Sequence, residues 1–203
     1  MSVFTFATAE YASGDWESAP SLPESVIDAL AKYTTIDVAP TGVNVKLSSD
    51  ALFNYPFIWM TGHLPVRFTD VERRNVKRYV ERGGLLMIDD HNHDVTGQFH
   101  KTANEEIERI FGKMTRLPKN HELYSCFFVF DDGPPNTHHE LNGWGDNLLH
   151  KYLDAILVHD RIGLIYSSKD YSSEWNFHAD TKKFMQEDPT KFAVNLIVYA
   201  LTR

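Results

Sequence analysis

The stretch GGLLMIDDHNHD, residues 83–94, decides the fold. Its apolar centre, Leu85–Ile88, is a continuous run typical of strands that are buried on both faces. The two glycines before it predict the end of a helix, because glycine adopts the left-handed conformation at a helix C-terminus with little cost. The titratable residues begin where this strand ends. The stretch therefore predicts a helix, a buried strand and a polar site, in that order.

A second buried strand precedes this unit. Phe57–Thr61 is another continuous apolar run, and Thr69 with Glu72 has the spacing of a capping box that opens a helix. Further strands are expected at Val3–Ala9 and Ile162–Tyr166. The alternation predicts an α/β fold of three layers, in which helices cover both faces of a mainly parallel central sheet. We expect residues 1–203 to form a single domain.

Weaker signals predict the remaining elements. Helix starts are expected at the Ser21/Glu24 and Thr102/Glu105 capping boxes, and at Asp188 before a last helix over Thr190–Leu201. A further helix is expected around Leu148–Leu153. Extended segments are expected at Ile36–Ala39, Asn44–Leu47 and Cys126–Phe130. A long loop is expected over Asp131–Gly145, within an insertion of about 113–146.

Composition excludes several classes of protein. The 203 residues are 42% hydrophobic and 24% charged, which is typical of a globular chain and not of a disordered or fibrous one. The formal net charge is -8, and basic residues form no run longer than two, so we do not expect nucleic acid as a partner. The single cysteine, Cys126, excludes an internal disulfide.

The sequence leaves the compartment open. No apolar stretch approaches the roughly 18 residues of a membrane span, so we expect no membrane insertion. Residues 1–6 lack a basic region and a long apolar core, so we expect no signal peptide. The protein is then either cytoplasmic or a mature exported form whose signal has been removed.

Polar residues accumulate at the expected strand ends. Ligands of open α/β sheets bind outside the carboxyl ends of the strands, so these residues are candidates for a binding site. The candidate ligand-binding residues are Glu10, Tyr11, Asp15, Trp16, Trp144, Lys169, Asp170 and Trp175. The alternative is structural: such side chains also cap helices and satisfy loop backbone, and the aromatic residues also pack under loops.

Histidines suggest a metal site at the same edge. His91 and His93 are two residues apart, and His63 follows the neighbouring strand, so a site with three histidines, or two histidines and one carboxylate, is geometrically reasonable. His138 and His139 would close over it from the long loop. Imidazole and carboxylate ligands suit Zn²⁺, Mn²⁺ or Fe²⁺. Asp90 or Glu140 would then be the general base for hydrolysis. The alternative is a hydrated polar loop.

Several ordered stretches resemble a known family. Asn54–His63, Tyr79–Gly84 and Leu85–Asp90 resemble a superfamily, and Tyr11–Trp16, Gly83–Asp90, His138–Asp146, Ser167–Trp175 and Asn195–Thr202 resemble one family within it. The chain is similar to the bacterial domain-of-unknown-function family 4159, within the class I glutamine-amidotransferase-like superfamily. The resemblance implies a flavodoxin-like sandwich. Amidotransferases use a cysteine on a tight strand-to-helix turn, whereas Cys126 lies in an aromatic run and no such turn is present. Glutaminase chemistry is therefore not carried over.

Three hypotheses for function follow. The favoured one is a module that binds a small molecule or a partner protein through the polar cleft at the strand ends. The second is a metal-dependent hydrolase that uses the same cleft. The third is a structural subunit of a larger assembly, which an extended exposed apolar patch would favour. The oligomeric state is left open by the sequence.

Overall fold

A seven-stranded mixed sheet organises the chain, which the computed structural model describes over residues 3–176 and 186–203. The strand order is β2-β1-β3-β4-β7-β6-β5. The strands are β1 (Ala7–Glu10), β2 (Val43–Lys46), β3 (Phe57–Gly62), β4 (Leu85–Asp90), β5 (Thr115–Arg116), β6 (Asp154–Val158) and β7 (Arg161–Ser167). The helices are α1 (Leu22–Tyr33), α2 (Asp70–Glu81), α3 (Gln98–Phe111), α4 (His138–Leu141), α5 (Tyr171–Trp175) and α6 (Glu187–Thr202), with 3-10 turns η1 (Asp50–Asn54) and η2 (Glu122–Tyr124).

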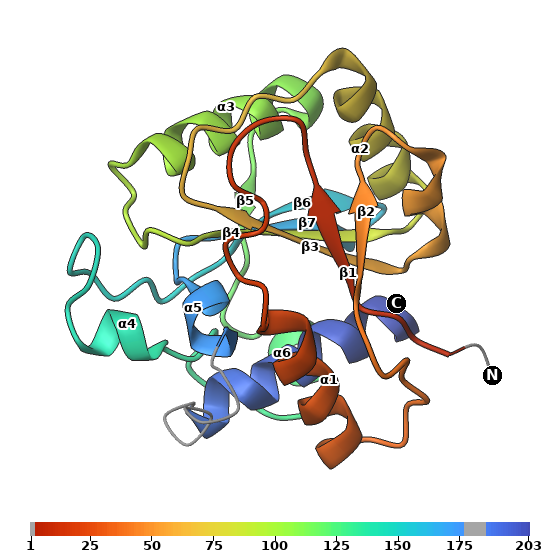
Figure 1. The fold of residues 1–203 in the computed structure, drawn as a ribbon. Helices are drawn as coiled ribbons and strands as arrows, with labels where there is room; N and C mark the ends of the chain where they lie inside the picture. The colour runs from red at the N-terminus through yellow and green to blue at the C-terminus, as the bar shows by residue number, and fades with distance from the viewer. Residues whose placement is uncertain (1–2, 177–185) are drawn as a thin grey trace.

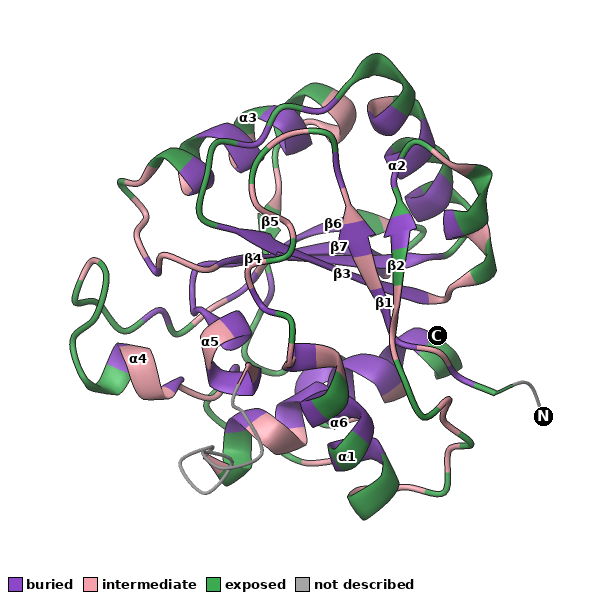
Figure 2. Cartoon of the chain, viewed as in Figure 1, coloured by how far each residue is buried: buried purple, intermediate pink, exposed green. Residues whose placement is uncertain are grey.

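Helices cover both faces of the sheet (Figure 1). Alternate residues of β3 point to opposite faces: Phe57 and Trp59 pack with α1, α5 and α6, whereas Ile58 and Met60 pack with α2 and α3. This two-sided burial explains the continuous apolar runs, since neither face of the strand meets water. Figure 2 shows the central strands buried along their length.

The pairing of strands differs across the sheet. Pairing is parallel from β2 through β1, β3 and β4 to β7, and antiparallel between β7 and β6 and between β6 and β5. The sheet is therefore mixed. The helix expected around Leu148–Leu153 is wrong: this segment has no helix and leads into β6. Its apolar residues fitted a helical period, but they continue into a strand that pairs with β7 as a hairpin.

Only one of the three expected capping boxes forms. Thr69 and Glu72 make both reciprocal hydrogen bonds at the start of α2. Ser21 precedes α1 in helical geometry without a side-chain cap, and its N–H donates to Asn176 instead. Thr102 lies inside α3, where its hydroxyl donates to Gln98 and accepts from the N–H of Val66.

Other boundaries also shift. The first strand begins at Ala7, and Phe4 forms only an isolated bridge with Val38, so Ile36–Ala39 is not a strand. The last helix begins at Glu187 with Gln186 as N-cap, which places Asp188 and Pro189 within its first turn. The expected extended segment at Asn44–Leu47 is confirmed as β2. The stretch 113–146 lies between α3 and β6 and carries β5, η2 and α4, so the loop expected over Asp131–Gly145 contains a short helix.

The strand expected at Cys126–Phe130 is wrong, and Asn195 of α6 explains why. The Asn195 side chain accepts from the N–H of Phe128 at 2.8 Å. It also donates to the carbonyls of Leu123 and Phe128, at 2.9 and 2.8 Å. A fully buried amide thus supplies the hydrogen bonds that a neighbouring strand would otherwise give to this segment.

We expect Asn195→Ala to lower the free energy of unfolding by about 2–4 kcal/mol, because it leaves buried backbone groups of the 123–128 segment unpaired. The measurement is urea denaturation followed by circular dichroism. Thr202→Ala on the exposed end of the same helix is the control and should change stability by less than about 0.5 kcal/mol. Equal effects of the two substitutions would contradict this role of Asn195.

Candidate functional site

The carboxyl ends of four adjacent parallel strands meet at one edge of the sheet. These strands are β1, β3, β4 and β7. The residues that follow them come from segments that are distant in sequence, yet they lie side by side, as expected for this kind of sheet. Here the backbone turns away from the sheet, and polar side chains collect.

An Asp15–His63 pair joins the ends of β1 and β3. Asp15 Oδ1 accepts from the N–H groups of His63 and Leu64 at 2.8 and 3.0 Å, and Oδ2 lies 2.7 Å from His63 Nδ1. Partial burial raises the pKa of Asp15, but these hydrogen bonds outweigh it and hold the pKa below its usual value. Gly62 permits the approach, since a Cβ there would lie 2.9 Å from Asp15 and 2.3 Å from the Tyr11 hydroxyl.

His91, after β4, stacks on His63. The two ring centroids are 4.2 Å apart and the planes are inclined by 24°. His91 Nδ1 lies 3.1 Å from the Ser18 hydroxyl, and its Nε2 lies 3.9 Å from Asp170. Burial lowers the pKa of His91, against the attraction of Asp170, so the ring is neutral at pH 7.

An Asp170–His139 pair lies at the end of β7. Asp170 has a left-handed backbone (φ 56°), and its Oδ1 caps α5 by accepting from the N–H of Ser173. Its Oδ2 lies 2.6 Å from His139 Nδ1, and this hydrogen bond raises the pKa of His139. Trp144 stacks on the His139 ring with a centroid separation of 5.4 Å, and 62% of its surface is exposed.

We call Asp15, His63, His91, His139 and Asp170 the strand-end histidine cluster. In both Asp–His pairs the carboxylate holds Nδ1, so the ring carries its hydrogen there and Nε2 remains for another partner. This arrangement orients histidines that act as general bases or metal ligands. His63 and His139 expose 42% and 25% of their side chains, so their rings are accessible to a ligand.

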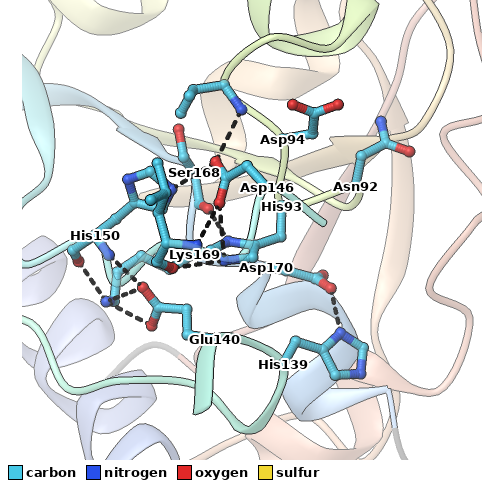
Figure 3. A network of polar contacts seen from close by, with 12 residues as sticks. Asn92, His93, Asp94, His139, Glu140, Asp146, His150, Ser168, Lys169 and Asp170 are labelled. Carbon is cyan, nitrogen blue, oxygen red and sulfur yellow. Dashed lines mark hydrogen bonds and ion pairs between the residues drawn. The ribbon is translucent and has the colours of Figure 1, made fainter. Parts of the chain in front are cut away.

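His93 lies apart from this cluster, although it is only two residues from His91. Its positive φ of 49° turns the side chain into the interior, beside Asp146 and His150 (Figure 3). Among residues 3–176 and 186–203, this trio is the one group of three histidine or acidic ligands whose atoms lie within 4.8 Å of one another. The three histidines expected to bind one metal ion, His63, His91 and His93, therefore do not lie together. His138 and His139 are not part of the trio either.

Glu140 and Lys169 form a buried ion pair that fastens α4 to the end of β7. Lys169 Nζ lies 2.8 and 2.7 Å from the two Glu140 oxygens and also donates to the His150 carbonyl. Burial lowers the pKa of Lys169, while Glu140 opposes that shift. Both side chains have no exposed surface. In this geometry neither the expected base Glu140 nor the expected ligand residue Lys169 reaches solvent.

Asp89 and Asp90 are buried carboxyl groups at the end of β4. Asp89 Oδ2 accepts from the N–H and hydroxyl of Ser172, both at 2.7 Å, and Asp90 Oδ1 accepts from the N–H of Asn92. Within the described chain, the other oxygen of each has no hydrogen-bond partner. Burial raises the pKa of Asp89 to about 8 and that of Asp90 to about 7. Both therefore hold protons that an exposed aspartate would release.

The remaining expected ligand residues have mainly structural contacts. Tyr11 is buried and donates to the Thr61 carbonyl, and Trp175 is buried against Tyr171 with its Nε1 donating to Pro189. Trp16 packs against the core, Glu10 pairs with Lys46, and half-buried His138 begins α4.

Sequence reasoning missed Ser18, Asp146 and His150. Ser18 lies in a loop with no recognisable motif. Asp146 and His150 are four residues apart, which is a common ligand spacing, but the apolar residues after Asp146 predict a helix, whereas the segment is a loop that folds back on His93.

The family model "Domain of unknown function (DUF4159)" matches residues 5–201. The chain belongs to this family. No curated protein matches the sequence. Within the described residues, no helix is long and apolar enough to span a bilayer.

We expect Lys169→Met to lower the free energy of unfolding by about 3–5 kcal/mol, because it leaves the buried Glu140 carboxylate without a cation. Lys169→Met with Glu140→Gln should recover much of the loss, since the charge is then removed. The measurement is urea denaturation. The control Lys77→Met, in an exposed pair with Glu81, should have a far smaller effect. A double variant no more stable than Lys169→Met would contradict the assignment.

We expect Asp89→Asn to flatten the dependence of stability on pH. The folded protein keeps the Asp89 proton to about pH 8, whereas the unfolded chain releases it near the ordinary aspartate pKa of 3.8. The carboxyl's contribution to stability is thus present below pH 4 and is lost as pH rises to 8. Urea denaturation between pH 4 and 8 should show that the free energy of unfolding falls less with increasing pH for the variant than for the wild type. The exposed control Asp132→Asn should show the same pH dependence as the wild type. If the stability of Asp89→Asn also varied with pH in parallel with the wild type, the raised pKa of Asp89 would be refuted.

Proposed function

We propose that the protein is a binding module that recognises a polar small molecule or a segment of a partner protein at the strand-end histidine cluster. One observation carries the proposal: two Asp–His pairs hold Nδ1 of rings whose side chains are 42% and 25% exposed, and the exposed Trp144 stacks on one of them. The Nε2 atoms would bond hydroxyl or acidic groups of a ligand, and the indole would cover its apolar face.

In this proposal, residues 1–203 form one domain with a flavodoxin-like scaffold, similar to that of the class I amidotransferases. The domain has lost glutaminase activity. Cys126 supports this loss. Its thiol contacts the carbonyls of Leu123 and Asn195, and burial raises its pKa to about 11. A thiol in that state is a poor nucleophile at neutral pH.

A metal-dependent hydrolase using Zn²⁺, Mn²⁺ or Fe²⁺ is the alternative. It is supported less, because the histidines proposed as ligands are divided between the cluster and the interior, and the proposed base Glu140 is bound to Lys169. It would require His63, His91 and His139 to converge on one ion during binding.

We expect His139→Ala and Trp144→Ala to weaken ligand binding by about 1–3 kcal/mol each, because each removes a central contact while the fold stays intact. Saturation-transfer NMR against sugars, short peptides and small organic acids would find ligands, and titration would give the dissociation constants. His159→Ala, in the turn between β6 and β7, is the control and should bind as the wild type does. Unchanged affinity in both cluster variants, or no ligand from any class, would contradict the proposal.

A further inference from the structure

The interior trio His93, Asp146 and His150 is separate from the strand-end histidine cluster. We propose that it is a structural Zn²⁺ site that fastens the loop before β6 to the end of β4. The ligands would be the Nε2 atoms of His93 and His150 and the Asp146 carboxylate, with the Leu148 carbonyl as the fourth. The inference is independent of the proposed binding function.

The spacing of these atoms fits a tetrahedral ion. His93 Nε2 lies 3.5 Å from Asp146 Oδ1 and 3.0 Å from the Leu148 carbonyl oxygen, and His150 Nε2 lies 2.9 Å from Asp146 Oδ2. Bonds of about 2.0–2.2 Å from Zn²⁺ to nitrogen and oxygen place adjacent tetrahedral ligands roughly 3.3 Å apart. Small adjustments of side chains would therefore accommodate the ion.

The orientation of the His93 ring is an independent sign that a cation belongs here. Its Nδ1 lies 2.5 Å from the Ser168 carbonyl oxygen, which fixes the hydrogen on Nδ1 and the lone pair on Nε2. That lone pair faces two further oxygen acceptors, those of Leu148 and Asp146. Three acceptors around one ring require either a second ring proton or a metal ion at Nε2. The convergence of His150 on the same carboxylate favours the metal.

Burial argues for a structural ion over a catalytic one. The side chains of His93, Asp146 and His150 are 1%, 6% and 5% exposed, so water has little access to a bound ion. A closed tetrahedral set is characteristic of structural zinc, whereas catalytic zinc keeps an open position. Imidazole ligands select Zn²⁺ over Mg²⁺ and Ca²⁺, which prefer oxygen.

The backbone around the trio is built for close approach. Asp146 N–H donates to the His93 carbonyl at 2.8 Å. Gly145 has a φ of 63°, and a Cβ there would lie 2.0 Å from that carbonyl, so only glycine fits. Trp144 comes immediately before this contact, so an ion at the trio would also hold the indole in place against His139.

The test is zinc titration of the full chain, purified without a histidine tag, by calorimetry and by elemental mass spectrometry after dialysis. We expect one equivalent of Zn²⁺, and we expect Asp146→Asn and His150→Gln to weaken its binding roughly 100-fold or more. The double variant His63→Gln with His91→Gln is the matched control and should bind Zn²⁺ like the wild type.

A second measurement on the wild type guards against variants that do not fold. In the presence of Zn²⁺, long-range ¹H–¹⁵N NMR of the imidazoles should show that His93 carries hydrogen on Nδ1 alone. The Nε2 signal of His93 should shift when Zn²⁺ is added. No stoichiometric Zn²⁺, loss of the ion in the His63/His91 variant, or a His93 ring that keeps hydrogen on both nitrogens in the presence of Zn²⁺ would overturn the proposal.

Discussion

The burial of the central strands on both faces is the constraint on which the rest of the structure depends. Strands β3 and β4 are buried over their full lengths between two layers of helices, so their interiors have to be apolar. Polar side chains are then confined to the strand ends, and the carboxyl groups nearest the core, Asp89 and Asp90, are buried with raised pKa values. The same constraint that makes the sheet stable thus determines where chemistry can be located.

Long irregular segments are held to this scaffold by a few buried polar side chains. Asn195 supplies hydrogen bonds to the 123–128 segment, and the Lys169–Glu140 pair fastens α4. Asn195 takes the place of a neighbouring strand with contacts from a single side chain, so backbone groups of the 123–128 segment stay satisfied. These contacts hold the segment between α3 and β6 against the rest of the fold, although little of it is regular secondary structure.

The sequence predicted the elements whose signals are local and missed those that depend on distant partners. The runs at β3 and β4 and the Thr69 capping box are local, and all were found. The Cys126–Phe130 segment has strand-like residues, but Asn195 from α6 takes its hydrogen bonds. The polar residues expected at the strand ends do lie at one edge of the sheet, but His91 and His93, which the spacing predicts on the same side, diverge because the backbone at His93 is left-handed.

The stacking of His63 on His91 limits the charge that this surface can carry. With ring centroids 4.2 Å apart, a proton on one imidazole repels a proton on the other, and the repulsion adds to the desolvation that already disfavours a charged His91. Both effects act in the same direction and hold the pKa of His91 below its ordinary value. A visiting molecule would therefore meet an uncharged imidazole at His91, which contributes hydrogen bonding and no net charge to recognition.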